Sequence, residues 1–223
     1  MTVAARLGEV RQRIAAAEAR AGRAAGSVEL VAVTKTVGLR EITEVMAAGQ
    51  RALGENRAQE LVSKAAELGG DPSSGPVWHF VGRLQRNKVK MLAPHVARWH
   101  SVDRLELVEV LARHAPGSRV YVEVNVAEEP QKGGCAPGYT AALVDALTGA
   151  GIAVEGLMTV PPAAGDPRAH FARLREMASG LGLGGLSMGM TGDFEIAIEE
   201  GATVVRVGSA IFGPRRTGAD LRR

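Results

Sequence analysis

The sequence has one cysteine and few aromatic residues. Cys135 cannot form a disulfide within the chain and offers no cysteine-based metal site, so we interpret it as a small half-buried residue. Aromatic residues make up 4% of the chain, and none lies within the densest basic cluster, RLQRNKVK at 83–90. Proteins that hold nucleic acid strands combine basic with aromatic side chains. We therefore predict that this cluster is the solvated start of a helix, with a nucleic-acid surface as the alternative.

Long apolar runs are also missing. No stretch of eighteen apolar residues is present, and residues 1–26 alternate charged with apolar residues instead of forming the apolar core of a signal peptide. Basic and acidic residues nearly balance, with 27 Lys and Arg against 24 Asp and Glu. These features predict a cytoplasmic protein that binds neither a membrane nor a nucleic acid, and no metal site is expected.

Strand-like and helix-like segments alternate along the whole chain of 223 residues. Residues 3–24 carry apolar side chains every three or four positions, which is typical of an amphipathic helix. Eight strand segments follow, each with a helix or terminal loop after it: 29–34, 51–55, 77–81, 97–101, 119–126, 153–158, 186–188 and 203–207. This pattern predicts a single (β/α)₈ TIM barrel at 29–213, with an extra N-terminal helix within 1–25 and a C-terminal tail at 214–223.

The first strand segment lies within ELVAVTKT at 29–36, and a lysine, Lys35, follows it. Residues 30–33 are apolar and largely β-branched, as in a strand that is buried on both faces. Functional groups of a barrel gather where its strands deliver their carboxyl ends, and Lys35 follows such an end. A primary amine held there is a candidate for a Schiff base with a carbonyl compound. The alternative is a lysine that leaves the strand into solvent.

Two segments near the end of the chain, SMGMT at 187–191 and RVGSAIFG at 206–213, indicate an anion site. Loops after the seventh and eighth strands of such barrels commonly bind phosphate through backbone N–H groups. Gly208 lets the backbone approach an anion closely, and the hydroxyls of Ser209 and Thr191 can donate further hydrogen bonds. The alternative is that Gly208 only turns the chain after the last strand.

Arg206 precedes this loop by two residues. Strand alternation places its side chain on the same face as Gly208, toward the barrel mouth if Val205 and Val207 face the helices. A guanidinium that faces a pyridine nitrogen would keep that nitrogen unprotonated and weaken the ring as an electron sink. The alternative is an ion pair with a rim carboxylate such as Glu200.

Seven ordered segments carry a resemblance that runs through nearly the whole chain: VAVTKT, GENRAQE, WHFVGRLQRNK, VNVAEEPQKGG, EGLMTV, LSMGMTGDFEIAI and VRVGSAIFG. The chain resembles the pyridoxal phosphate homeostasis proteins, the YggS/PROSC family, whose barrel is similar to the N-terminal domain of alanine racemase. The resemblance implies that Lys35 forms a Schiff base with pyridoxal 5'-phosphate. It further implies that Arg206 faces the pyridine nitrogen, that Asn56 lines the ring, and that Thr191, Gly208 and Ser209 hold the phosphate.

The chain departs from the family pattern at three positions. The family usually has serine at Thr191, a change that keeps the hydroxyl, and it often has other residues at Arg83 and Arg86. Three further residues are expected behind those that touch the cofactor: His79, Lys132 and Met188. His79 alternates with Trp78 and Phe80 and points into the barrel, either near the cofactor or as a neutral core histidine. Lys132 matches in place an arginine of alanine racemases, and the alternative is a solvated loop lysine.

Racemization needs two acid/base groups, one on each face of a planar intermediate. Alanine racemases take the second from a tyrosine of a further domain, and neither tyrosine of this chain, Tyr121 or Tyr139, matches it in position. We therefore expect no catalytic residue and predict a protein that buffers or delivers pyridoxal phosphate, with apo forms of enzymes that use it as partners. The alternatives are an amino-acid racemase of the alanine-racemase type and a Schiff-base aldolase with Lys35 as nucleophile.

Overall fold

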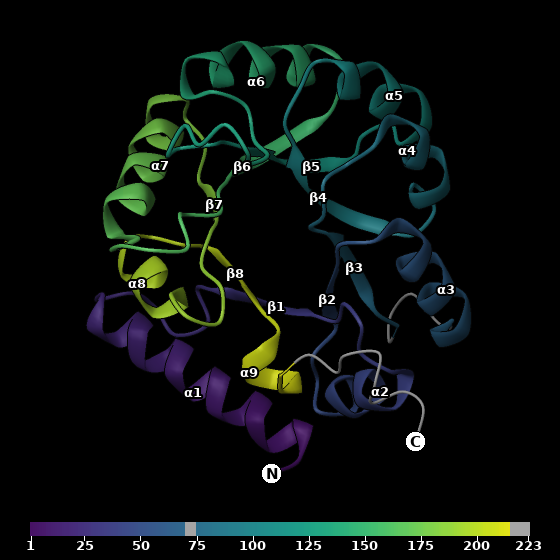
Figure 1. Cartoon of the computed structure of the whole chain (residues 1–223), viewed down its shortest axis with the longest axis vertical. Coiled ribbons are helices and arrows are strands. Elements are labelled where there is room, and N and C mark those ends of the chain that lie inside the picture. Colours follow the sequence, from purple (N-terminus) through teal and green to yellow (C-terminus); the bar gives the residue numbers. More distant parts are fainter. Residues whose placement is uncertain (70–74, 215–223) are drawn as a thin grey trace.

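Eight parallel strands pair in chain order and close into a barrel, because β1 pairs with both β2 and β8 (Figure 1). The computed structural model describes residues 1–69 and 75–214. The strands are β1 (Glu29–Val33), β2 (Ala52–Glu55), β3 (Val77–Phe80), β4 (Val96–Val102), β5 (Arg119–Glu123), β6 (Ala153–Met158), β7 (Gly185–Ser187) and β8 (Val204–Val207). The predicted (β/α)₈ barrel is confirmed.

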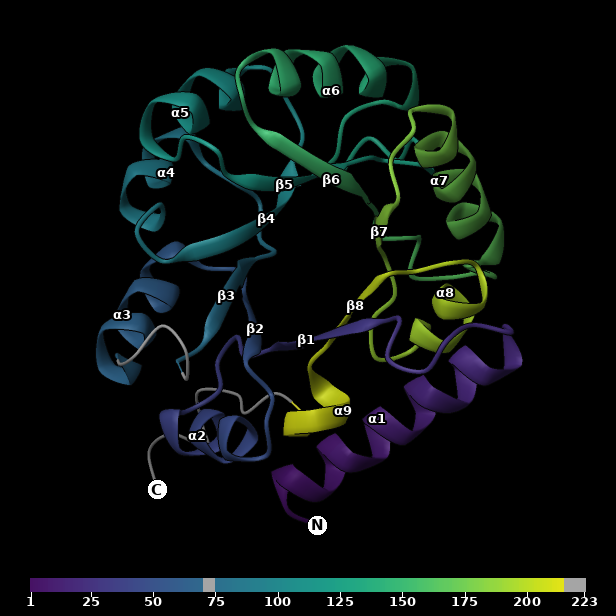
Figure 2. The same ribbon diagram turned by 180° about the vertical axis from the view of Figure 1, so that it is seen from behind.

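Helices follow the strands and form the outer ring seen in both views (Figure 1, Figure 2). They are α1 (Val3–Arg20), α2 (Leu39–Ala47), α3 (Ala58–Leu68), α4 (Arg86–Leu92), α5 (Glu106–His114), α6 (Thr140–Gly149), α7 (Arg168–Gly180), α8 (Phe194–Glu199) and α9 (Ser209–Phe212). A 3₁₀ turn, η1 (Pro137–Tyr139), leads into α6. In the described residues, no helix is long and apolar enough to cross a membrane.

Strand alternation divides the apolar residues into two sets. Outward-facing side chains such as Leu30 and Val205 join the main core between the strands and the helices. Inward-facing side chains form a small cluster inside the barrel: Val31, Tyr121, Met158 and Val204. This inner apolar set is small, and buried polar side chains such as His79, His100 and Ser187 fill other parts of the barrel interior.

The N-terminal helix α1 packs outside the ring, against α2, α8 and α9 (Figure 1). Its predicted apolar stripe, Val3, Leu7, Val10, Ile14 and Ala17, is buried. Arg6 Nε donates to the backbone oxygen of Ile211 on α9 at 2.6 Å, and Arg13 pairs with Glu195 on α8 at 2.9 Å. The start of the chain is thereby fixed to the helices that follow the last two strands.

The predicted element ends differ from the observed ones by a few residues. The opening helix ends at Arg20 instead of residue 24, because Gly22 takes a positive φ of 65°. The fifth strand ends at Glu123 instead of residue 126, and the helix predicted from residue 139 begins with η1. Most of the predicted loop at 71–76 and the predicted tail beyond Pro214 lie outside the described residues.

Candidate functional site

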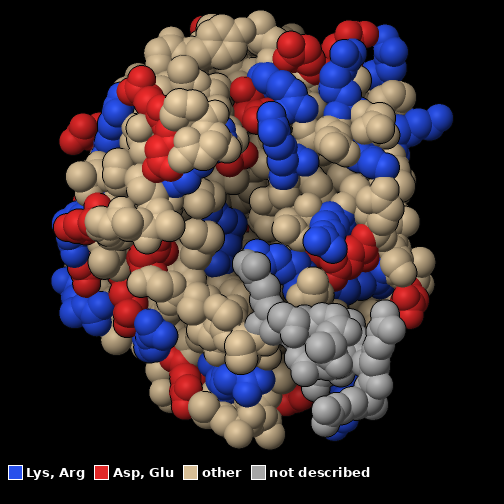
Figure 3. All heavy atoms as spheres, in the orientation of Figure 1, with Lys and Arg blue, Asp and Glu red and all other residues tan. Residues whose placement is uncertain are grey.

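A pocket of about 960 Å³ opens where the strands deliver their carboxyl ends. In Figure 3, Lys and Arg side chains gather around a hollow near the centre of the face shown. The pocket is lined by all six residues predicted to bind the cofactor: Lys35, Asn56, Thr191, Arg206, Gly208 and Ser209. They come from the ends of β1, β2, β7 and β8, so barrel closure brings together residues from the two ends of the sequence.

Lys35 is partly buried and lines the pocket, in contrast to a lysine that leaves the strand into solvent. The next residue, Thr36, has a φ of 62°, which is an uncommon conformation for a residue with a branched side chain. Its N–H donates to Glu60 Oε1 on α3 at 2.6 Å. The turn that carries the lysine is therefore held in a strained conformation by a side chain of a neighbouring helix.

A buried ion-pair cluster beneath this turn supports it. Lys64 Nζ donates to Glu55 Oε1 at 2.6 Å, to Glu60 Oε1 at 2.7 Å and to the backbone oxygen of Thr34 at 2.7 Å. The Glu55 side chain is fully buried and that of Lys64 is 9% exposed. Burial raises the pKa of Glu55, and the hydrogen bond from Lys64 opposes that shift. Lys64 thus joins β1, β2 and α3 next to Lys35.

The anion end of the pocket is built from the loops after β7 and β8. Ser209 Oγ lies 3.2 Å from Thr191 Oγ1, so the two predicted hydroxyls are brought together. A Cβ on Gly208 would lie 3.2 Å from the backbone oxygen of Val33, at the end of β1. Gly208 therefore allows the turn after β8 to approach the end of β1 closely. A residue that only turned the chain would not need this close approach.

Arg206 extends into the barrel and is 5% exposed. Its Nη1 donates to Ser187 Oγ at 2.7 Å and its Nη2 donates to the backbone oxygen of Thr159 at 3.0 Å. Burial lowers the pKa of Arg206 to about 10, so the guanidinium stays charged at neutral pH. Two of its five N–H donors are used in these bonds, and the group also lines the pocket.

The alternative partner proposed for Arg206 is not observed. Glu200 instead pairs with Arg168 and Arg175, both on α7. The predicted strand alternation is confirmed, because Val205 and Val207 lie in the core between strands and helices while Arg206 points inward.

Asn56 lines the pocket and carries a buried acceptor. Its Oδ1 is buried and has no hydrogen-bond partner among the described residues. A buried acceptor of this kind costs free energy unless a ligand or water supplies a donor. The backbone around it is fixed by close contact, since a Cβ on Gly82 would lie only 2.1 Å from the Asn56 backbone oxygen. A ligand donor that reached Oδ1 would remove this cost.

Sequence reasoning missed several pocket residues, of which Glu123 is the most informative. It ends β5 and lines the pocket with Arg83 and Met158. Burial, and next the nearby Asp103, raise the pKa of Glu123 to about 7, although Arg206 and Arg83 act in the opposite direction. A carboxyl group that exchanges its proton near neutral pH therefore shares the pocket with Lys35.

The raised pKa of Glu123 predicts a pH-dependent stability. The unfolded chain ionises this group near pH 4.5, whereas the folded chain keeps its proton up to about pH 7. Between these values the folded state binds more protons, so this contribution to stability falls as pH rises. In the cofactor-free protein, Glu123→Gln should therefore gain on the order of 1–3 kcal/mol relative to wild type between pH 5 and pH 8.

Urea unfolding at the two pH values measures this difference. Glu176→Gln is the control, because it changes an exposed glutamate on α7. An equal response of both variants to pH would show that Glu123 is ionised at pH 5 in the fold.

The three residues expected behind the cofactor lie outside the pocket lining. His79 is fully buried inside the barrel, and Met188 is fully buried in the outer core. Lys132 Nζ donates to the backbone oxygen of Pro161 at 2.9 Å and pairs with Glu129 at 3.2 Å. Lys132 is therefore a partly exposed residue outside the pocket lining, and it ties the loop after β5 to the loop after β6.

Neither of the two tyrosines lines the pocket. Tyr121 is 5% exposed and stacks on His100 inside the barrel, with ring centroids 4.7 Å apart. Burial raises its pKa to about 12. Tyr139 is 41% exposed on the outer surface. Within the described chain, the pocket thus has no tyrosine that could act as a second acid or base.

Comparison with known proteins agrees with this architecture. Residues 6–216 match the family described as alanine racemase, N-terminal domain. The chain is 43% identical to a pyridoxal phosphate homeostasis protein of Pseudomonas aeruginosa, with 98% of each chain covered, and 40% identical to one of Aquifex aeolicus, with 97% of this chain and 100% of the other covered. PipY of Synechococcus elongatus, solved with PLP bound, superposes with a TM-score of 0.81 at 32% identity over 95% of this chain and 100% of that one.

Proposed function

Because the chain belongs to the family of pyridoxal phosphate homeostasis proteins, we propose that it binds pyridoxal 5'-phosphate in this pocket and buffers or delivers it. Lys35 would hold the cofactor covalently, and Thr191, Gly208 and Ser209 would hold its phosphate. Arg206 would face the pyridine nitrogen, and Asn56 would accept a hydrogen bond from the ring substituents. The single observation that carries this proposal is that all six residues line one pocket.

The chemistry of the residues fits the cofactor. When bound, pyridoxal phosphate supplies an aldehyde, which condenses with a primary amine and loses its oxygen as water. The pocket offers that amine in Lys35 and hydroxyl donors in Ser209 and Thr191. It is also lined by Asn56, whose buried Oδ1 has no hydrogen-bond partner within the part of the chain that the structure describes. Arg206 is a permanent donor, which favours an unprotonated ring nitrogen.

A carrier role is favoured over an efficient racemase. A racemase holds a second proton donor on the face of the substrate opposite the lysine. Tyr121 is stacked inside the barrel with a raised pKa and Tyr139 is exposed, so neither supplies that donor. Glu123 lines the pocket and has a pKa of about 7, so a test of the carrier role must include a variant of this residue.

We expect no exchange of the α-hydrogen of alanine or serine at enzyme-like rates in deuterated water. The reason is that proton transfer needs a donor and acceptor fixed about 3 Å from the reacting carbon on each face. Proton NMR of the amino acid, with protein that has been loaded with pyridoxal phosphate, measures this exchange. The same protein should pass its cofactor to an apo-enzyme that requires it.

Rapid exchange would overturn the carrier role. Its loss in Glu123→Gln would make Glu123 the second acid/base group, whereas its loss in Tyr121→Phe alone would give that role to the tyrosine. Tyr139→Phe serves as the control, since Tyr139 is exposed and outside the pocket lining.

A further inference from the structure

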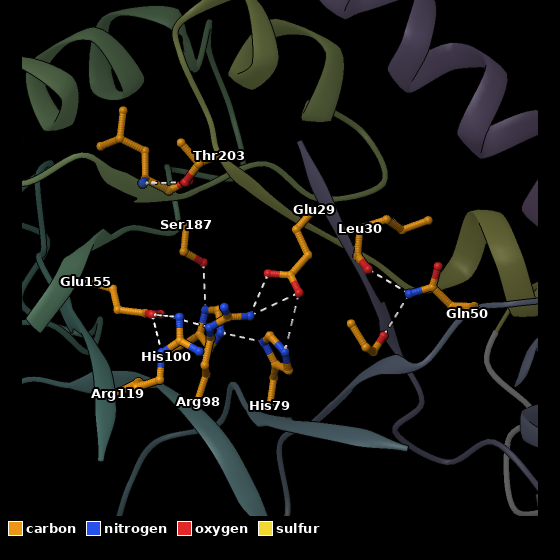
Figure 4. A network of polar contacts seen from close by, with 12 residues as sticks. Glu29, Leu30, Gln50, His79, Arg98, His100, Arg119, Glu155, Ser187 and Thr203 are labelled. Atoms are coloured by element: carbon orange, nitrogen blue, oxygen red, sulfur yellow. Dashed lines mark hydrogen bonds and ion pairs between the residues drawn. The ribbon is translucent and has the colours of Figure 1, made fainter. Parts of the chain in front are cut away.

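A line of hydrogen-bonded side chains runs through the barrel interior from Arg206, away from the pocket. Arg206 Nη1 lies 2.7 Å from Ser187 Oγ, Ser187 Oγ lies 2.8 Å from His100 Nδ1, and His100 Nε2 lies 2.9 Å from His79 Nδ1. Ser187, His100 and His79 are fully buried. Figure 4 shows the part of this line from Ser187 to His79 and the groups beyond it.

The chemistry of Arg206 fixes the direction of every bond in the line. A guanidinium can only donate, so Ser187 Oγ accepts from it. His100 Nδ1 is then the one group among the described residues that can accept the serine hydrogen, which would otherwise be a buried donor without a partner. A neutral imidazole that accepts at Nδ1 carries its proton on Nε2. His100 therefore donates from Nε2 to His79 Nδ1, and His79 also carries its proton on Nε2.

Both histidines are neutral at neutral pH. Burial lowers the pKa of His79 to about 3, with smaller contributions from Arg98 and Arg119. Burial likewise lowers the pKa of His100 well below its usual value, and His79 and Arg206 add to the shift. A neutral imidazole accepts a hydrogen bond at one nitrogen and donates from the other, so the direction of one bond determines the direction of the next. A charged imidazolium donates from both nitrogens and could not accept in this line.

The line ends at charged groups inside the opposite part of the barrel (Figure 4). His79 Nε2 lies 3.9 Å from Glu29 Oε1, which is beyond hydrogen-bond distance, and it has no closer partner among the described residues. Glu29 pairs with Arg98 at 2.9 Å, and Arg98 pairs with Glu155 at 2.8 Å. The far end of the line thus faces a carboxylate, which attracts the Nε2–H of His79.

We infer that Ser187, His100 and His79 are positioning residues for Arg206. They hold the guanidinium in one orientation against the pocket, and the guanidinium in turn fixes both histidines as the Nε2–H tautomer. The part of this inference that concerns the cofactor rests on the proposed function. Its consequence is that a change at His79, three hydrogen bonds away from Arg206, alters how Arg206 meets the ligand.

Side chains that only filled the core would behave differently. If His79 lost its acceptor nitrogen, His100 could satisfy its buried groups by moving its proton to Nδ1, and Ser187 would then accept from both neighbours. Ser187 would no longer donate along the line, and the position of Arg206 would loosen. If His79 only filled the core, its replacement would lower the free energy of unfolding but would leave the ring proton of His100 on Nε2.

Paired variants test the inference. Ser187→Ala and His79→Phe remove a link, whereas Ser187→Thr keeps the hydroxyl and His79→Gln keeps an acceptor in the side chain. We expect the two link-removing variants to bind pyridoxal phosphate roughly tenfold more weakly, in line with the loss of one hydrogen bond to a charged group, and to change the absorption spectrum of the bound cofactor. The two conservative variants should stay close to wild type in both measurements.

Nitrogen NMR of protein labelled at histidine gives a readout that does not depend on the cofactor. In wild type without ligand, both ring protons should be on Nε2, and Arg206→Met should produce a mixture of tautomers at His100. A proton on Nδ1 of either histidine in wild type would overturn the inferred direction. Equal affinity and spectrum in wild type and Ser187→Ala would overturn the positioning role, even if His79→Phe did not fold.

Failure of the proposed function is distinguishable from failure of this inference. If wild-type protein takes up no pyridoxal phosphate, the proposed function is wrong, while the tautomers in the ligand-free protein still decide whether Arg206 controls the line.

Discussion

Lys35→Ala protein should retain no pyridoxal phosphate after borohydride reduction, whereas wild-type protein should keep one label on Lys35. The covalent bond needs a primary amine in the pocket, and Lys35 lines that pocket at the end of β1. Wild-type protein should also show the visible absorbance of a cofactor bound to an amine. Absorption spectra before reduction and peptide mapping after it measure both effects.

Lys132→Ala is the matched control for this experiment. Lys132 is a partly buried lysine in a loop at the carboxyl ends of the strands, but its Nζ is held by Pro161 and Glu129. The control should keep the label and the absorbance. A label found only on Lys132 in wild-type protein would refute the assignment of Lys35.

Lys64→Met should lower the free energy of unfolding by about 3–5 kcal/mol, because it leaves the buried Glu55 carboxylate without its cationic partner. The loss should be accompanied by weaker cofactor binding, since Lys64 and Glu60 also hold the backbone on either side of Lys35. Urea unfolding of the cofactor-free protein measures the first effect, and titration with pyridoxal phosphate measures the second.

Two further variants separate the buried charge from other causes. Lys90→Met changes an exposed lysine on α4 and should alter stability by less than about 0.5 kcal/mol. The double change Lys64→Met with Glu55→Gln removes both charges and should recover part of the loss. If the single and double variants were equally destabilised, lost packing around Lys64 and not an unpaired carboxylate would be responsible.

The fold and the ends of the pocket could be predicted from the sequence because both depend on local patterns. Strand and helix periodicity locates the barrel units, and a residue just after a strand, such as Lys35 or Gly208, must lie at the mouth. The same alternation correctly placed Arg206 and His79 inside the barrel. The roles of these residues toward the cofactor remain predictions.

Other features of the site depend on contacts between distant segments. Glu123 looks like any charged residue at the end of a strand, and its proton affinity is set by burial beside Asp103. A lysine such as Lys64 on α3 is equally compatible with an exposed helix face, so its burial could not be predicted from the sequence. The pairing of His79 with His100 depends on the register between β3 and β4, which shifts between Trp78 and His79.

Closure of the barrel between β1 and β8 has a consequence for the order of assembly. Lys35 follows the first strand and Ser209 follows the last, so the pocket forms only when nearly the whole chain has been synthesised and its two ends have met. A ligand that contacts both Lys35 and Ser209 binds the closed barrel and not the open chain. It therefore stabilises the pairing of β1 with β8. Hydrogen exchange at the backbone amides of β1 and β8 should slow when pyridoxal phosphate is added, because cofactor binding would also stabilise the closed barrel against opening.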